Sequence, residues 1–220
     1  MTESAFMSKI KTFIEQFKKI HSKGLPGEDA QFDMVPITRR TEMKKMQHSS
    51  TPKESGVLIL FYEKDQEIFT VFMKRTAYDG VHSGQISFPG GKYEETDHSL
   101  IETAFREAEE EVGIDRNSTF HIGELTELFI PPSNFNVLPV LAFTEKMPEF
   151  KIDKTEVDKL IEVPLSLLFD PGIVKMKEIK TRRNERVDVP CYYIDNEIIW
   201  GATAMIVSEL NVLLKAINQE

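Results

Sequence analysis

Four glutamates lie within five consecutive positions of the segment FREAEEEVGI, residues 105–114. They are Glu107, Glu109, Glu110 and Glu111. If this segment is a helix with its apolar residues toward the core, then Glu107, Glu110 and Glu111 share one flank, because residues three and four apart are neighbours. Each such like-charge pair costs roughly 0.3 kcal/mol on an exposed helix. The cluster is either a solvated acidic face or a carboxylate site for Mg²⁺ or Mn²⁺, ions that prefer oxygen ligands.

The segment FPGG, residues 88–91, precedes this helix and favours the cation site. Glycine lets the backbone approach a ligand closely, so a carbonyl oxygen of Gly90 or Gly91 could add a further ligand to the carboxylates. A merely solvated acidic helix does not require such a turn. A Mg²⁺ site of this kind usually also uses the phosphates of a substrate.

Hydrophobic spacing predicts the elements that position these groups. Residues 97–112 carry an apolar stripe at helical spacing, Gly113 is a natural stop, and Ser99 with Glu102 fits a capping box. The stripe consists of Leu100, Ile101, Ala104, Phe105, Ala108 and Val112. Two β-rich runs around KDQE, within residues 56–75, predict a hairpin. The Gly-rich stretch 76–97 predicts a long functional loop.

The rest of the chain alternates between strands and a few helices. Strands are predicted at 120–130, 136–144, 173–179 and 189–195, and helices at 164–170 and 202–216. Residues 4–20 predict an amphipathic helix that could cover the core or the partner in a homodimer. We therefore expect an α/β or α+β fold with a mixed sheet. We place an N-terminal helix and arm at 1–55 and the compact domain at 56–220.

Composition narrows the classes of function. The net charge of −9 argues against a general nucleic-acid binder, because such proteins depend on positive patches. No apolar run approaches the roughly 20 residues that span a bilayer, and the N-terminus lacks the apolar part of a signal peptide. The one cysteine, Cys191, agrees with a reducing compartment. We expect a cytoplasmic protein. An anionic substrate would require a local positive charge, which divalent cations held by carboxylates would supply.

The segment GGKYEETDHSLIETAFREAEEEVGI, residues 90–114, resembles the Nudix box, G-x5-E-x7-R-E-U-x-E-E-x-G-U with U apolar. The second half matches from Arg106 to Ile114. In the first half, the interval from Gly91 to Arg106 is one residue longer, and Asp97 stands where a glutamate is usual. The resemblance implies a Nudix-type α/β/α sandwich, with the mixed sheet between helices. It also implies a pyrophosphohydrolase that hydrolyses a phosphoanhydride with Mg²⁺ or Mn²⁺.

The stretch VFMKRTAYDGVHSGQISFPGG, residues 71–91, is similar to the motif of the coenzyme A pyrophosphatase branch. The positions in register are Arg75, Thr76, His82, Gly84, Gln85, Phe88, Pro89, Gly90 and Gly91. Asp79 replaces a leucine, and Gly80 replaces an arginine that could grip a phosphate bidentately. Coenzyme A or an acyl-CoA is the implied substrate, a nucleotide-type diphosphate. The alternatives are a pyrophosphatase for ADP-ribose or another nucleoside diphosphate derivative, and a ligand-sensing module without activity.

The resemblance also implies a role for each site residue. The expected metal ligands are Glu107, Glu110, Glu111 and a backbone carbonyl of Gly90 or Gly91. Arg106 is expected to orient a glutamate through a salt bridge. Glu156, in a later loop, is the candidate general base, with Glu110 or Glu111 as the alternative. The expected substrate-binding residues are Arg75, His82 and Gln85.

Overall fold

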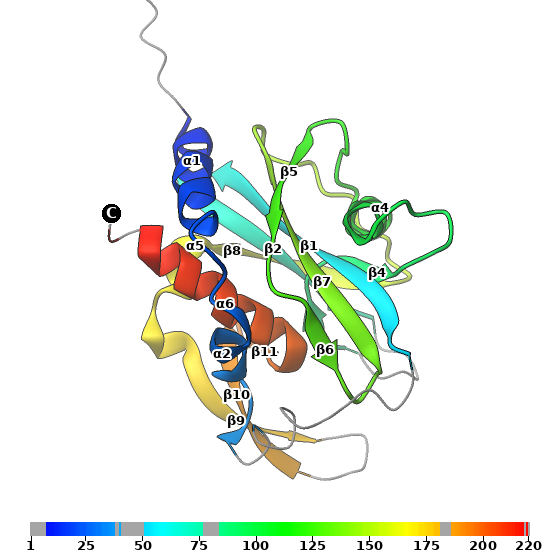
Figure 1. Cartoon of the computed structure of the whole chain (residues 1–220), viewed down its shortest axis with the longest axis vertical. Helices are drawn as coiled ribbons and strands as arrows, with labels where there is room; N and C mark the ends of the chain where they lie inside the picture. The colour runs from blue at the N-terminus through cyan, green and yellow to red at the C-terminus, as the bar shows by residue number, and fades with distance from the viewer. Residues whose placement is uncertain are drawn as a thin grey trace, which may run out of the picture.

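A mixed β-sheet lies between two layers of helices in the computed structural model, which describes residues 8–37, 40, 51–76, 84–180, 186–217 and 219 (Figure 1). One face is covered by α4 (Leu100–Val112). The other is covered by α1 (Lys9–His21) and α6 (Gly201–Ile217), with the short α2 (Gly27–Phe32) beside α6. This arrangement confirms the expected α/β sandwich.

The main sheet has eight strands, with the order β3-β2-β1-β7-β5 along its path. These strands are β1 (Lys53–Lys64), β2 (Glu67–Arg75), β3 (Ile86–Ser87), β5 (Thr119–Glu124) and β7 (Phe135–Thr144). Three further strands pair with β1, β7 and β2 respectively: β4 (Gly90–Lys92), β6 (Leu128–Ile130) and β8 (Val157–Pro164). Only the β1–β7 pair among these is parallel, so the sheet is mixed as predicted.

A smaller sheet of three strands, in the order β11-β10-β9, lies below the main sheet in the view of Figure 1. Its strands are β9 (Val174–Lys180), β10 (Arg186–Ile194) and β11 (Glu197–Ile199). The helix α5 (Leu165–Leu168) and the 3-10 turn η1 (Pro171–Ile173) lead into it from β8. Cys191 is a buried free cysteine in β10.

The central strand β1 has a hydrophobic core on each face. Leu58, Leu60 and Tyr62 belong to the cluster under α4, whereas Ile59 and Phe61 belong to the cluster under α1 and α6. Successive side chains of a strand point to opposite faces, so this continuous apolar run is the expected sequence of a strand buried on both sides.

The N-terminal helix covers the chain's own core. Its apolar side chains are buried in the same cluster as α6: Ile10, Ile14, Phe17 and Ile20. The amphipathic stripe allowed this helix to cover either the core of its own chain or a partner in a homodimer. The structure shows it on the core. The division at residue 55 stays a prediction, although α1 and α2 pack on the core of the residues that follow. None of the described helices is long and apolar enough to cross a membrane.

Most predicted elements are present with shifted ends. The helix expected from residue 97 begins at Leu100, and the hairpin turns at Asp65 and Gln66, both in the left-handed region. The sequence did not predict β3, β4, α2, β8 and β11. Of these, β3, β4 and β11 have only two or three residues and α2 has six, so these four elements show no clear periodicity.

Candidate active site

The acidic helix α4 is capped at both ends by local hydrogen bonds. At its start, Ser99 Oγ accepts from the Glu102 N–H at 3.2 Å, and Glu102 accepts from the His98 N–H at 2.9 Å. The capping is as predicted, except that the carboxylate reaches one residue beyond Ser99. At its end, Gly113 has φ 73° and its N–H donates to the Glu109 carbonyl. Contacts within a few residues therefore determine where α4, the helix that carries the carboxylates, begins and ends.

A glycine lets this helix lie against the sheet. Gly56 of β1 faces the first turns of α4, and a Cβ at this position would overlap the carbonyl oxygen of Leu100 and crowd Ala104. Ala104, Ala108 and Val112 are fully buried against the sheet. The close approach sets how deeply the flank of α4 sinks toward β4 and β1.

The three glutamates of the predicted metal site differ in depth. The Glu111 side chain is 2% exposed, that of Glu107 is 16% exposed and that of Glu110 is 59% exposed. Glu109, the free position of the Nudix box, is exposed. The flank of the helix therefore runs from the core at Glu111 to solvent at Glu110.

Glu111 is a buried carboxylate. Its Oε2 accepts a hydrogen bond from the Gly90 N–H at 2.8 Å, and its Oε1 lies 3.2 Å from Arg75 Nη2. That contact lacks hydrogen-bond geometry, so Oε1 is buried without a hydrogen bond. Burial raises the pKa of Glu111 to about 8, aided by the charges of Glu107 and Glu156, although Arg75 and the Gly90 N–H act in the opposite direction.

The glycines of FPGG shape the space around these carboxylates. The Glu107 carboxylate lies against Gly91, where any Cβ would overlap it. A Cβ on Gly90, which has φ 150°, would overlap the Gly56 carbonyl oxygen. Burial raises the pKa of Glu107, although Arg106 opposes the shift. The backbone of β4 therefore approaches two of the three predicted ligands directly.

Arg106 lies at the centre of a network of carboxylates. Its Nε and Nη2 donate to the two oxygens of Asp97 at 2.8 and 3.0 Å, and its Nη1 donates to Glu107 at 3.0 Å and to Glu110 at 3.2 Å. Asp97 is buried and also accepts from Thr103 Oγ1 at 2.8 Å. The hydrogen bonds from Arg106 hold the pKa of Asp97 well below its usual range. Asp97, the departure from the Nudix pattern, thus anchors this arginine.

The loop that carries Glu156 is tied to the end of α4. The Lys151 and Asp153 N–H groups donate to the carbonyls of Val112 and Glu111, both at 2.9 Å. The Glu156 carbonyl accepts from the Thr76 N–H at 2.9 Å. The sequence did not predict these backbone hydrogen bonds. The turn D-x-T, in which Asp153 Oδ1 accepts from the N–H and hydroxyl of Thr155, was the local signal available.

These ties bring Glu156 next to Arg75. Arg75 Nη2 lies 3.8 Å from Glu156 Oε2, and the Glu156 side chain is 54% exposed. Gln85 is adjacent, because its carbonyl accepts from the Arg75 N–H at 3.0 Å. The neighbouring Lys74 points elsewhere and binds Glu197 of β11 at 2.8 Å. His82, predicted to bind substrate, lies outside the described residues.

The site brings together eight of the predicted residues, and the carboxylate and carbonyl oxygens among them are of the kind that a hard divalent cation prefers. They are Arg75, Gly90, Gly91, Arg106, Glu107, Glu110, Glu111 and Glu156. Within the described ranges, no three His, Cys, Asp or Glu side chains are arranged to hold a metal ion. Instead, Arg75 and Arg106 form ion pairs with the carboxylates. The buried Oε1 of Glu111, which lacks a hydrogen bond, is a suitable donor.

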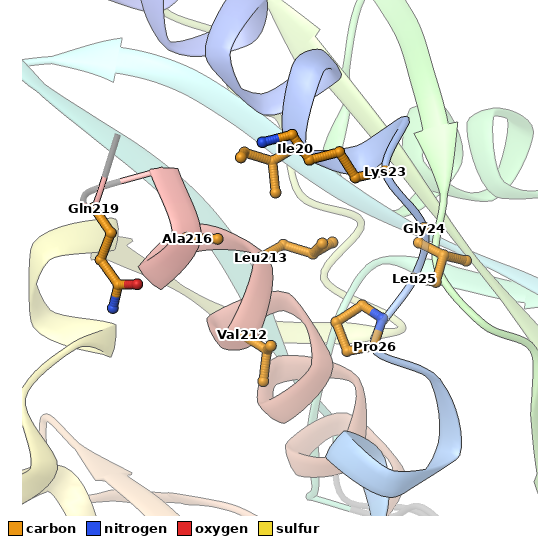
Figure 2. Close-up of a pocket in the computed structure, with 9 residues that line it drawn as sticks. All are labelled: Ile20, Lys23, Gly24, Leu25, Pro26, Val212, Leu213, Ala216 and Gln219. Carbon is orange, nitrogen blue, oxygen red and sulfur yellow. The ribbon is translucent and has the colours of Figure 1, made fainter.

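A pocket of about 590 Å³ lies away from these residues, between the α1–α2 connection and α6 (Figure 2). Its walls are mainly apolar, with Ile20, Leu25 and Pro26 facing Val212 and Leu213. It is on the face of the sheet opposite to α4. None of its described lining residues has an acidic side chain, so these residues do not offer the carboxylate ligands that suit a cation-bound diphosphate.

The sandwich and its glycine-flanked acidic helix define a known class of enzyme. Residues 52–180 match the NUDIX domain family. The chain belongs to the Nudix family of hydrolases.

Particular relatives and one solved structure agree with this assignment. The chain is 36% identical over 137 residues to the uncharacterized Nudix hydrolase NudL of Pectobacterium atrosepticum, covering 62% of this chain and 70% of that protein. It is 33% identical over 163 residues to a NudL of Yersinia pestis, covering 74% and 80%. The fold is similar to that of a MutT/nudix family protein from Enterococcus faecalis, with TM-score 0.51, 14% identity and coverage of 96% and 76%.

Proposed function

We propose that the protein hydrolyses the diphosphate of coenzyme A or an acyl-CoA, giving 4′-phosphopantetheine or its acyl form and adenosine 3′,5′-bisphosphate. The observation that carries the proposal is the buried Glu111, held between the Gly90 N–H and Arg75. Arg75 is the first, and Gly90 the next to last, of the positions that match the coenzyme A pyrophosphatase motif. Residues from both parts of that motif therefore contact the most buried carboxylate of the Nudix helix.

Three carboxylates would hold Mg²⁺ or Mn²⁺ in this proposal: Glu107, Glu110 and Glu111, joined by a carbonyl of Gly90 or Gly91. When bound, a divalent cation neutralises the diphosphate and lowers the pKa of water. Arg106 positions Glu107 and Glu110 through its hydrogen bonds to both. Asp97 in turn holds Arg106 at two points, which limits the rotation of the guanidinium.

Glu156 is the proposed general base. It takes a proton from the attacking water while the water oxygen forms a bond to phosphorus. The bond from phosphorus to the bridging oxygen breaks, and the leaving phosphate keeps the electron pair. The exposure of Glu156 allows it to meet water, and its loop is attached to the backbone of Glu111 through Asp153. Arg75, Gln85 and His82 are the proposed substrate contacts.

Glu156→Gln is expected to lower kcat by about 10²-fold, a typical loss for a general base. Steady-state kinetics with saturating Mg²⁺ would measure the effect. The matched control is Glu149→Gln, an exposed glutamate of the same loop, which should leave kcat unchanged. An unaltered kcat in Glu156→Gln would transfer the role to Glu110 or Glu111.

A substrate panel tests the identity of the substrate. The purified protein would be incubated with Mg²⁺ or Mn²⁺ and with coenzyme A, acetyl-CoA, ADP-ribose or a dinucleoside polyphosphate, and the products separated by chromatography. We expect kcat/KM for coenzyme A or acetyl-CoA to exceed that for ADP-ribose by about tenfold or more, equivalent to about 1.4 kcal/mol. Efficient hydrolysis of ADP-ribose without turnover of coenzyme A would contradict the proposal.

A further inference from the structure

The two arginines of the site are held in different ways. Arg106 donates to both oxygens of Asp97 and also to Glu107, Glu110 and the Lys92 carbonyl. Among the described residues, the Arg75 guanidinium has two ionic contacts, at 3.2 Å to Glu111 and at 3.8 Å to Glu156. The shorter contact does not have hydrogen-bond geometry. Arg106 is therefore anchored, whereas Arg75 is held mainly by charge.

The oxygen that Arg75 neutralises is also the one best suited to a cation. Glu111 Oε2 is already bound to the Gly90 N–H, whereas Oε1 is buried and accepts no hydrogen bond. A buried carboxylate that is ionised needs a countercharge. A divalent cation at Oε1 would supply that charge and would repel the guanidinium 3.2 Å away.

We propose that Arg75 is an exchangeable counter-ion of Glu111. It neutralises this carboxylate while the site holds no divalent cation, and it leaves Oε1 when a cation binds there. Its planar guanidinium then becomes available for a phosphate of the substrate, which it can bind through two parallel N–H groups. The inference rests on the proposed function in one respect, that Glu111 is a cation ligand.

This exchange couples two binding events. The cation competes with Arg75 for Glu111, and the displaced Arg75 gains a partner only when a diphosphate is present. Binding of the cation therefore favours binding of the substrate, and the coupling is reciprocal by thermodynamic linkage. Arg75 is also the cationic neighbour of Glu156, so the exchange takes place beside the proposed base.

The test compares the unfolding of the wild type and Arg75→Gln in urea, once with EDTA and once with saturating Mg²⁺. We expect Arg75→Gln to be less stable than the wild type in EDTA, because Glu111 loses its countercharge. In Mg²⁺ the two unfolding curves should coincide, because the cation takes over that role. The same cycle requires Mg²⁺ to bind Arg75→Gln about tenfold more tightly than the wild type, which titration calorimetry would measure.

The matched control is Lys64→Gln, which loses a lysine contact to Glu162 at 3.0 Å, where no cation is proposed. Its effect on stability should be the same in EDTA and in Mg²⁺. An equal loss of stability for Arg75→Gln in both conditions would show that Arg75 is a fixed part of the fold and would overturn the inference. A wild type that gains no stability from Mg²⁺ would instead overturn the cation site itself, and the inference with it.

A second measurement uses the wild type alone and does not depend on the folding of a variant. The guanidinium resonances of Arg75 and Arg106 would be followed by ¹⁵N NMR during a titration with Mg²⁺. We expect the Arg75 resonances to shift and the Nε resonance of Arg106, which is bound to Asp97, to stay in place. An Arg75 resonance that remains unchanged at saturating Mg²⁺ would contradict the exchange.

Discussion

Glu111→Gln is expected to lower kcat by about 10³-fold, which corresponds to about 4 kcal/mol of transition-state stabilisation. Glutamine has nearly the same shape and can still accept the hydrogen bond from the Gly90 N–H, so the backbone of β4 should stay in place. The variant lacks the negative charge that would hold a divalent cation in the buried part of the site. The loss should therefore appear in kcat and in the affinity for Mg²⁺ together.

The measurement is the rate of diphosphate hydrolysis as a function of Mg²⁺ concentration for the wild type and the variant. Glu109→Gln is the matched control, since it removes a glutamate from an exposed position of the same helix. It should leave kcat unchanged. Circular dichroism of both variants would verify that α4 is formed. Wild-type activity in Glu111→Gln would show that the buried carboxylate has no part in catalysis.

Arg106→Met is expected to lower the free energy of unfolding by about 3–5 kcal/mol, the usual cost of leaving a buried charge without its partner. Methionine preserves much of the aliphatic stem but removes both hydrogen bonds to the buried Asp97. It also removes the guanidinium that contacts both Glu107 and Glu110. Urea unfolding in EDTA, at neutral pH, would measure the difference.

The same pair makes stability depend on pH in a defined direction. Hydrogen bonds from Arg106 keep the pKa of Asp97 below its usual range in the folded protein. A lowered pKa stabilises the fold fully above the unfolded value of about 3.9, and this contribution is lost as the pH falls below it. The difference between the wild type and Arg106→Met should therefore be constant near neutrality and shrink in acid.

Arg116→Met provides the matched control for this prediction. Arg116 lies 3.8 Å from Glu102, and both side chains are about one-third exposed. Exposed ion pairs contribute about 0–1 kcal/mol, so this substitution should have a small effect that varies little between neutral and acidic pH. If Arg116→Met lowered the free energy of unfolding as much as Arg106→Met, the burial of Asp97 would not explain the contribution of Arg106 to stability.

Local patterns in the chain were sufficient to predict α4 and its carboxylates. The apolar stripe, Ser99 with Glu102, and Gly113 act through contacts within a few residues, so the sequence contains the whole of their physical cause. The same holds for the hairpin, whose turn residues lie between two apolar runs. The glutamates of the Nudix box and the glycines of FPGG could likewise be proposed as ligands before any fold was known, and these roles stay predictions.

The depth of each glutamate and the identity of its neighbours depended on contacts between distant parts of the chain. Glu111 is buried because Gly56 lets α4 approach β1 and because the Gly90 N–H lies over its carboxylate. Glu156 reaches Arg75 only because backbone hydrogen bonds attach its loop to β2 and to the end of α4. Helical periodicity describes the residues of one element and cannot say what packs against their flank. The partnership of Arg75 with Glu111 therefore emerged only from the folded chain.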